Sequence, residues 1–446
     1  MDSNEFHKWL IESFGEEGGE MAWKQFSSLP DSIKDELLSE SRLPSPGEMR
    51  KIFSAFKAAG AEGGESSKEV INRPLTTQMA LRTAEEKHFK NTISALQFDR
   101  LSQATSSANL WLDSASFTLP LPEKTKILTP RQWTEGAVGA WANLVTPLAQ
   151  GMEGTAMEFL KQQGDLGYSW GVFAGGVPIP GVEADAQSLL QNAIRTNFAI
   201  QLGSAIGEMS ILTLASFDYG IRTVGGKAGA LIAENLDAFA ADAQLPSEEV
   251  YAFYALREMA YARLYNSAPW IEGQISTLIY KYSRDFDLDT HENQGGSVLD
   301  MDLMNPGGMS AVINLSSLKA KDTEEQKKTK ESLQRLLTLV ESWVDCVTWR
   351  AGSAFIPHIS ELREMMRRRR AEGEMTGKVL AKLMGLGLDP KYLREMCAKW
   401  DKLSSNVEER DRLWAHPRLL SKVDGKGEEG EGDSDWDSDF TNLLKD

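Results

Sequence analysis

The sequence predicts a mainly α protein with few and short strands. Apolar residues recur at a spacing near 3.6 along much of the chain, which is typical of helices with one buried face. Helix-start signals precede several of these runs, and the strand–helix alternation that builds a parallel sheet is missing. The chain has 446 residues, of which 41% are apolar, and we therefore expect two or three domains with ample buried cores.

Helix-start signals locate several of the expected helices. Thr323 and Gln326 form a capping-box pattern, Pro130 suits a first helical turn, and Ser247 is expected to cap the helix that follows it. From these signals and the apolar spacing we expect helices over residues 6–14, 19–26, 46–58, 77–112, 131–152, 184–214, 246–265, 271–282, 323–351, 357–370, 377–386 and 390–403.

The most apolar stretch, residues 196–217, is expected to be buried rather than to cross a membrane. It contains Gln201 and Glu208, whereas a membrane span needs about 20 predominantly apolar residues. Gly203 and Gly207 lie four residues apart, on one face of the expected helix. Small residues at this spacing allow a second helix to approach closely, and so we predict such a packing here.

Composition and charge exclude several classes of function. Acidic residues outnumber Lys and Arg by 65 to 48, and the resulting net charge of −17 argues against nucleic-acid and anionic-membrane partners. Only Cys346 and Cys397 are present, which excludes a disulfide framework and favours a reducing, cytoplasmic location. The first residues lack the features of a signal peptide. The five histidines do not cluster in the sequence, and a His-rich metal site is therefore hard to build.

Residues 167–171 match the G-x-S-x-G pattern of serine hydrolases, with Ser169 at the position of the nucleophile. In those enzymes a strand precedes the serine and a helix follows it. Here a predicted helix precedes the serine and a Gly- and Pro-rich segment follows it, and so we do not expect a serine hydrolase.

Three other segments match known binding motifs only in part. Residues 220–227 approach a phosphate-binding loop, but the spacing is off by one and Ala228 replaces the magnesium-binding Ser or Thr. Residues 285–289 begin like a calcium loop, but Thr290 stands where glycine is required. His291 begins only half of an H-E-x-x-H motif. We expect a turn at the first segment and solvated loops at the others.

Residues 366–370, Met-Arg-Arg-Arg-Arg, form a basic run on a predicted helix. Nucleic-acid binding is one interpretation, but ion pairing with acidic neighbours agrees better with the negative net charge. The expected partners are Glu361, Glu364, Glu372 and Glu374.

The helix expected at residues 246–265 carries the run R-E-M-A-Y at residues 257–261, and Pro-Trp follows at residues 269–270. This region resembles a bacterial family of zinc-dependent metalloproteases with a zincin-like fold, which includes proteins associated with deazaflavin-coenzyme biosynthesis. The resemblance covers roughly residues 100–420. Further matching segments are residues 110–113, 133–135, 201–207, 234–235, 341–345, 367–370, 383–386, 392–394 and 412–417.

The resemblance implies a helical zincin-like fold and a role for particular residues. In the family the two histidines of H-E-x-x-H bind zinc from one helix face, the glutamate between them is the general base, and a later glutamate is the third ligand. By this resemblance Arg257 and Tyr261 occupy the two histidine positions, Glu258 the base position and Glu341 the third-ligand position. Asp345 is expected to contact these residues without binding the metal itself.

These replacements predict that zinc is not held, and so we expect no cofactor. Arginine has no lone pair to offer, and tyrosine coordinates a metal only after losing a proton with a pKa of ~10. The resemblance then implies a catalytically silent zincin-like pseudoenzyme with an unknown protein or peptide partner. The alternative is an active metallohydrolase or metallopeptidase with Glu258 as general base and non-standard ligands, such as Glu341 with Asp345 or a distant histidine.

The loss of a buried zinc would leave carboxylates unpaired, which is costly. We therefore expect Arg257 to fill the vacated place and to pair with Glu341, and also with Glu258. The alternative is that Arg257 faces solvent.

The sequence divides into an N-terminal helical region at residues 1–65, a helical domain at 75–235, a zincin-like domain at 236–422 and a disordered acidic tail at 423–446. Low hydrophobicity and nine acidic residues from Asp424 onwards predict the disorder of this tail. A solubilising role is expected, and a short motif for partner binding is the alternative.

Overall fold

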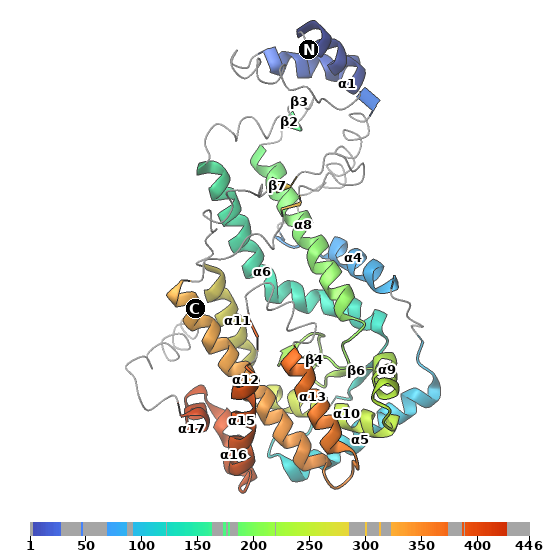
Figure 1. Ribbon diagram of the computed structural model, residues 1–446, viewed down its shortest axis with the longest axis vertical. Helices are drawn as coiled ribbons and strands as arrows, with labels where there is room; N and C mark the ends of the chain where they lie inside the picture. Colours follow the sequence, from blue (N-terminus) through green and yellow to red (C-terminus); the bar gives the residue numbers. More distant parts are fainter. Residues whose placement is uncertain are drawn as a thin grey trace. The chain divides into compact units, whose positions relative to one another are not determined.

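A computed structural model of the chain describes residues 3–27, 46–47, 69–86, 92–121, 123–162, 173–174, 177–178, 186–218, 220–284, 299–300, 312–313, 323–372, 386–387 and 389–425. The described residues are mainly helical with few short strands, as the sequence predicts (Figure 1). The predicted helices at 46–58 and 377–386, the Ser169 motif, the segment after residue 284 and the acidic tail lie almost entirely outside them.

The chain divides into two compact units. The first comprises Met1–Leu75, Thr146–Gln201 and Ser283–Lys321. The second comprises Thr76–Val145, Leu202–Tyr282 and Asp322–Asp446. The four sequence segments proposed above remain a prediction.

The first unit contains α1 (Ser3–Ser27), which is a pair of helices joined at Gly15. Gly15 has a φ of 80°, a backbone conformation that favours glycine, and the helix breaks there. Phe6 packs on Phe26 with ring centroids 4.7 Å apart, so the two halves run back along each other. This arrangement confirms the two separate helical runs expected at residues 6–14 and 19–26.

The core of the second unit is built around two long helices, α10 (Ser247–Ser267) and α12 (Glu324–Gly352). Every residue of α10 from Val250 to Tyr265 is buried, so this helix is covered on all sides. Three helices pack against this pair in Figure 1, namely α5 (Ala95–Ala115), α13 (Ile359–Glu372) and α15 (Pro390–Leu403).

Further helices complete the described chain. They are α4 (Arg73–Glu85), α6 (Pro130–Gln162), α8 (Ala186–Met209), α9 (Ala233–Ala243), α11 (Trp270–Arg284), α16 (Val407–Arg412) and α17 (Ser421–Asp424), with short 3-10 turns at Leu413–Ala415 and Pro417–Leu420. No helix among the described residues is both long and apolar enough to cross a membrane.

The strands are two or three residues long and occur in pairs. β1 (Lys126–Leu128) runs parallel to β6 (Ala230–Ile232), and β4 (Phe217–Asp218) is antiparallel to β5 (Ile221–Arg222). Ala215 bridges Leu231, so the segment that leads into β4 lies along β6. Two further antiparallel pairs join β2 (Phe173–Ala174) to β3 (Val177–Pro178) and β7 (Leu299–Asp300) to β8 (Val312–Ile313). A turn was expected at residues 220–227. This stretch contains the strand β5, and bends after β5 lead on towards β6.

Of the helix-start predictions, the capping box at Thr323 and the first-turn proline Pro130 are confirmed, since α6 begins at Pro130, and the cap at Ser247 is wrong. The capping box of Thr323 and Gln326 is present, with both reciprocal hydrogen bonds formed. Ser247 is the first residue of α10 rather than its cap, because Pro246 holds the extended N-cap position and offers no side-chain acceptor. The run expected at 77–112 is two helices, because Ser94 caps a new start by accepting a hydrogen bond from the Gln97 amide.

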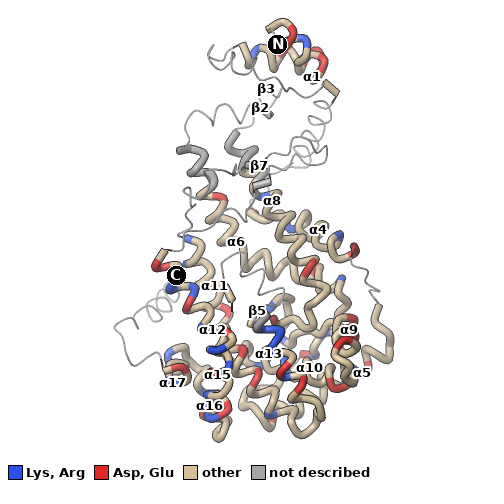
Figure 2. Tube along the Cα trace, in the orientation of Figure 1, with Lys and Arg blue, Asp and Glu red and all other residues tan. Residues whose placement is uncertain are grey.

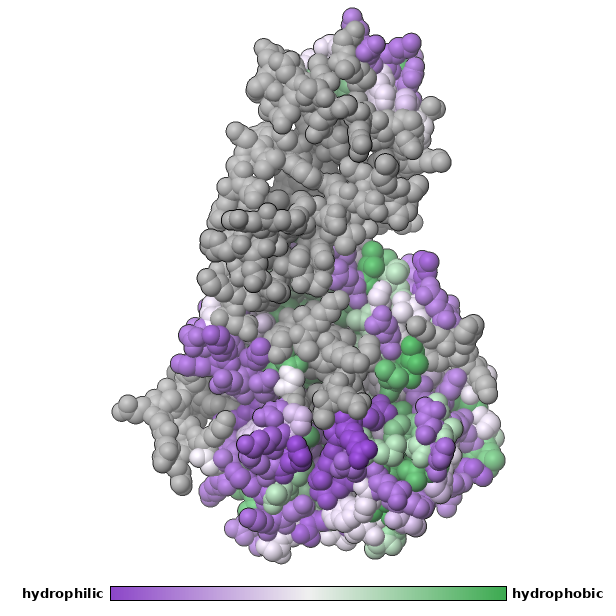
Figure 3. Space-filling model, viewed as in Figure 1, coloured by the Kyte–Doolittle hydropathy of each residue, from purple (hydrophilic) through white to green (hydrophobic). Residues whose placement is uncertain are grey.

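Polar residues cover much of the described surface, and apolar residues form separate patches (Figure 3). The largest exposed apolar side chains include Leu110, Phe117, Leu119 and Phe355. Exposed apolar residues of this kind are common on globular proteins.

Gly203 and Gly207 allow α8 to approach α4, which confirms the predicted packing. A Cβ atom on Gly203 would lie 2.6 Å from the Thr76 carbonyl oxygen, and one on Gly207 would lie 2.6 Å from the Ala80 carbonyl oxygen. These distances are shorter than van der Waals contact, and the opposing atoms belong to rigid helix backbone. The two helices can therefore meet only where the side chain is absent.

We predict that Gly207→Ala lowers the free energy of unfolding by about 1–3 kcal/mol, because the new methyl group must push α4 and α8 apart. Urea denaturation of the purified protein measures this change. Gly139→Ala in α6 is the matched control, since a Cβ there meets nothing within 4 Å. The control is expected to be neutral or to stabilise the protein by up to ~1 kcal/mol. Equal changes in the unfolding free energy of the two variants would contradict the close packing of α4 on α8.

Candidate functional site

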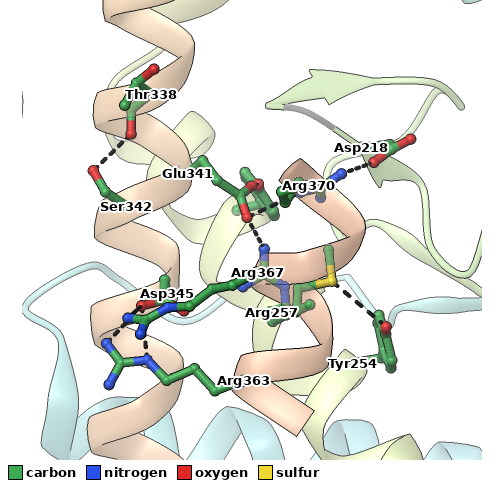
Figure 4. A network of polar contacts seen from close by, with 12 residues as sticks. Asp218, Tyr254, Arg257, Thr338, Glu341, Ser342, Asp345, Arg363, Arg367 and Arg370 are labelled. Carbon is green, nitrogen blue, oxygen red and sulfur yellow. Dashed lines mark hydrogen bonds and ion pairs between the residues drawn. The ribbon is translucent and has the colours of Figure 1, made fainter. Parts of the chain in front are cut away.

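The residues that the family resemblance assigns to a metal site lie where α10, α12, α13 and β4 converge (Figure 4). Arg257, Glu258 and Tyr261 belong to α10, and Glu341 and Asp345 belong to α12. All five are at most 5% exposed. A polar group this deeply buried needs a partner, and the hydrogen bonds of each side chain therefore decide what the site can do.

Glu341 is the centre of the site because both of its oxygens accept hydrogen bonds from charged or polar side chains. Its Oε1 lies 2.5 Å from Arg257 Nη2 and 3.2 Å from Arg370 Nε, and its Oε2 accepts from the Tyr261 hydroxyl. Arg257 and Tyr261 are four residues apart, so they project from one face of α10 towards the same carboxylate. The expected pairing of Arg257 with Glu341 is confirmed.

A second guanidinium extends this network to the strand β4. Arg370, which is only 3% exposed, donates from Nε to Glu341 and from Nη1 to Asp218 (Figure 4). The carboxylates of Asp218 and Glu341 therefore lie on either side of one cation. Three helices and one strand are held together by a chain of charge-assisted hydrogen bonds, which are stronger than neutral ones.

Asp345 has its own pair of cations. Its Oδ2 accepts from Arg363 at 2.8 Å and 2.6 Å, and from Arg367 at 2.9 Å. Asp345 lies one helical turn beyond Glu341 on α12, so the two carboxylates face α13 together. Asp345 lies close to Glu341, as expected from the sequence. Its hydrogen-bond partners are the guanidiniums of Arg363 and Arg367.

The basic run at residues 366–370 pairs differently from the sequence-based expectation. Arg368 pairs with a neighbour on its own helix, namely Glu364 at 3.2 Å. Arg367 and Arg370 instead reach across to the carboxylates described above, and Arg369 donates to the Leu212 carbonyl oxygen. The side chains at positions 372 and 374 lie outside the described residues. The expected partner Glu364 is confirmed, and Arg367 and Arg370 pair across helices because one face of α13 packs on α12.

The charges of the site fix its protonation states. Burial alone would raise the pKa of Glu341, but the guanidiniums of Arg257 and Arg370 hold that pKa below its ordinary value. Burial lowers the pKa of Arg257, and the charge of Glu341 more than restores it. Burial and the neighbouring Glu341 charge raise the pKa of Tyr261 well above its ordinary value. At neutral pH the site therefore holds an anion, two cations and a neutral phenol.

Glu258 points to a different set of partners. Its Oε1 accepts from the Ala230 amide at 2.7 Å and from the Ser216 amide at 3.1 Å and hydroxyl, and its Oε2 accepts from the Phe217 amide at 3.1 Å. Gly229 has a φ of 70°, and a Cβ there would collide with the Glu258 carboxylate. Glu258 thus ties β6 to the segment that leads into β4.

The expected contact between Arg257 and Glu258 is wrong for the described residues. Neighbouring residues point about 100° apart around a helix, and so the two side chains leave α10 in different directions. Burial raises the pKa of Glu258 to about 7, against the lowering effect of hydrogen bonds from Ser216, Ala230 and Phe217.

The groups at this site do not fit zinc. Within the described ranges no three His, Cys, Asp or Glu side chains are placed to hold a metal ion. Arg257 has no lone pair, and the raised pKa of Tyr261 keeps its phenol protonated. The cavity beside Arg257, Glu258 and Tyr261 measures about 30 Å³, which leaves room for about one water molecule.

Sequence reasoning found Arg257, Tyr261 and Glu341 but missed Asp218, Ser216 and Ala230. Arg370 lies in a run of four arginines that the sequence marks as unusual, and this run was the available signal. The partners of Glu258 are mainly backbone amides, which no pattern of side chains identifies.

We predict that Arg257→Ala lowers the free energy of unfolding by about 3 kcal/mol, because it leaves the buried Glu341 carboxylate with fewer partners. Urea denaturation at pH 7 measures the loss. Arg368→Ala is the matched control on an exposed arginine of the same network region, and its loss is expected to be about 0.5 kcal/mol or less. Equal losses would show that the buried pair contributes no more than a surface pair.

We predict that acid removes the stabilising effect of Glu341. The pKa of Glu341 is lower in the folded protein than its ordinary value of 4.5, so its ionised form stabilises the fold above that pH. As the pH falls below 4.5, the unfolded chain takes up a proton that the folded chain does not, and the effect is lost. The difference in unfolding free energy between wild type and Glu341→Gln should therefore shrink from pH 6 towards pH 3. Glu258 is present in both proteins, so its titration contributes equally to the two unfolding free energies and cancels in their difference. If this difference in unfolding free energy stays constant or grows as the pH falls, Glu341 is not ionised in the folded protein as described.

Comparisons with known proteins concern the fold and the family of this chain. One structure with a similar fold is a protein from Chloroflexus aurantiacus, provisionally described as a hydrolase with a novel fold. It is 14% identical, with a TM-score of 0.51 over 81% of this chain and 100% of that one, so the likeness concerns the fold alone. None of the curated proteins matches the sequence. A family model described as zincin-like metallopeptidase matches residues 71–424, which include α10, α12 and α13. The chain therefore belongs to the zincin-like metallopeptidase family.

Proposed function

We propose that this protein is a catalytically silent member of its family that serves as a binding or scaffold module. The observation that supports the proposal best is the convergence of Arg257 and Tyr261 on Glu341. These are the three positions at which the family resemblance places the zinc ligands. Two of them now hold a cation and a neutral phenol, and both donate hydrogen bonds to the third.

The electrostatics of the site support the loss of metal chemistry. A zinc ion brings two positive charges to a carboxylate, and here Arg257 and Arg370 bring two positive charges to Glu341. A metal that entered this place would meet guanidiniums and would have to displace them from Glu341. The arginines therefore compete with a dication both for space and for charge.

The position of Glu258 supports the same proposal. A general base must reach the proton that it removes, directly or through one water molecule. The carboxylate of Glu258 instead accepts four hydrogen bonds from the Ser216, Phe217 and Ala230 groups. Its role in this proposal is to hold β6 against the preceding segment.

We propose a protein or peptide as the partner, with no nucleic acid and no membrane. The net charge of −17 is unfavourable for polyanions and for anionic lipid surfaces, which supports this part of the proposal. A cytoplasmic location agrees with the two free, buried cysteines, Cys346 and Cys397.

One observation favours the alternative, an active metallohydrolase. Burial raises the pKa of Glu258 to about 7, which is the range that suits a general base at neutral pH. In that alternative the metal would need ligands that the family resemblance does not supply, such as Glu341 with Asp345. Both carboxylates are bound to arginines among the described residues, and the alternative therefore requires a rearrangement of α13 and of the Arg257 side chain on α10.

We predict that the purified protein contains only substoichiometric zinc and shows no rise in melting temperature when zinc is added. Elemental analysis and thermal melts measure both quantities. We also expect any peptide hydrolysis to be unchanged in Glu258→Gln, because a contaminating activity does not depend on this side chain. One tightly bound zinc per chain, together with peptidase activity that Glu258→Gln abolishes, would overturn the proposal and establish the alternative.

A further inference from the structure

The small cavity beside Arg257 is enclosed by three elements of the second unit that are far apart in the sequence. Its lining residues on α10 are Tyr254, Arg257, Glu258 and Tyr261, and those on α13 are Met366, Arg369 and Arg370. Each set recurs at a spacing of three or four residues and therefore lies on one helix face. The third wall is the segment 212–218 that leads into β4. The cavity is thus a concave site formed by two helices and one extended segment.

The lining of this cavity is basic, although the protein has a net charge of −17. Its three arginines are Arg257, Arg369 and Arg370, and Figure 2 shows basic residues on α13. Of the nearby carboxylates, Asp218 pairs with Arg370, and Glu341 is shared by Arg257 and Arg370. Burial raises the pKa of Glu258 to about 7, so this carboxyl group is only partly ionised at neutral pH. Positive charge is therefore in excess around the cavity.

Arg257 has hydrogen-bonding capacity left over at this place. A guanidinium has five N–H donors, and among the described residues Arg257 uses one hydrogen bond, to Glu341. The residue is only 3% exposed, and its other neighbours include the rings of Phe253 and Tyr261, at 6.0 Å and 5.9 Å from the guanidinium carbon. Buried donors need acceptors, and the cavity is a space beside this guanidinium in which an acceptor fits.

The size and the position of the cavity restrict what that acceptor can be. A volume of about 30 Å³ holds about one water molecule, so the four oxygens of a phosphate do not fit, whereas one oxygen of a planar carboxylate does. Leu212 lines the cavity and is 49% exposed, so the cavity reaches the surface on this side. Arg369 is held beside it, because its Nη2 donates to the Leu212 carbonyl oxygen at 3.2 Å.

We propose that this cavity binds one carboxylate group of a peptide. One carboxylate oxygen would replace a water molecule and accept from Arg257, and the other would face Arg369 at the surface. Such charge-assisted hydrogen bonds are stronger than neutral ones. Leu212 would contact the part of the peptide next to the carboxylate. The inference rests on the proposed function, because it needs a site in which arginines and not a metal ion surround Glu341.

The test uses the full chain and an eight-residue peptide of alanine and serine that ends in leucine and carries an uncharged fluorophore at its amino end. Fluorescence anisotropy is expected to show saturable binding when the C-terminal carboxylate is free. Amidation of that carboxylate is expected to weaken binding about tenfold or more. A further amidated peptide with glutamate next to the leucine identifies the source of the carboxylate. Binding of this peptide as tight as that of the free-carboxylate peptide would support recognition of a side-chain carboxylate.

Two neighbouring arginines of α13 provide matched variants. Arg369→Gln removes a cation that lines the cavity, and we expect it to weaken binding of the free-carboxylate peptide about fivefold or more. Arg368→Gln removes an exposed cation that pairs with Glu364, and it is expected to leave binding unchanged. Leu212→Glu places a carboxylate at the surface side of the cavity and is expected to prevent binding without changing the melting temperature.

Three results would overturn the proposal. In the first, the free-carboxylate peptide and both amidated peptides bind equally, so no carboxylate is recognised. In the second, Arg368→Gln and Arg369→Gln weaken binding equally, so the peptide responds only to total charge. In the third, no peptide binds saturably, and the cavity holds water only. Elemental analysis of the same sample keeps the two proposals apart: one tightly bound zinc per chain contradicts the proposed function, whereas a zinc-free protein that gives one of these three results contradicts this inference alone.

Discussion

The buried carboxylate of Glu341 is the constraint on which the arrangement of the second unit depends. An ionised carboxylate at 2% exposure is stable only when its charge and its lone pairs are matched. Arg257, Tyr261 and Arg370 supply that match from two different helices, and Arg370 passes the connection on to Asp218. The hydrogen bonds of this one group therefore join α10, α12, α13 and, through Arg370, β4.

The carboxylates of Glu258 and Glu341 have different partners and different protonation behaviour. Glu341 is matched by cations and remains charged, whereas Glu258 is matched by backbone amides and a hydroxyl, and its pKa is raised to about 7 by burial. The first carboxylate joins helices, and the second joins short strands to the helix beneath them. Among the described residues, both carboxylates therefore link elements that lie far apart in the sequence.

Much of the fold could be predicted because helices leave strong local signals. The capping box at Thr323, the glycine pair at 203 and 207, and the two halves of α1 all follow from residues close together in the sequence. The pairing of Arg257 with Glu341 was predictable because the family resemblance places both at one site. The partners of Glu258 and of Arg370 were not, since they depend on a β segment and a helix whose meeting is decided by tertiary packing.

The second guanidinium on Glu341 has a consequence for how this family member could change over time. A single substitution that placed a histidine at position 257 would still leave Arg370 bound to Glu341, and Asp218 bound to Arg370. Such a replacement taken alone would remove one buried ion pair and leave the other cation beside Glu341. Under the proposed function, a gain of metal binding at this place therefore requires several coordinated replacements, which is an evolutionary barrier.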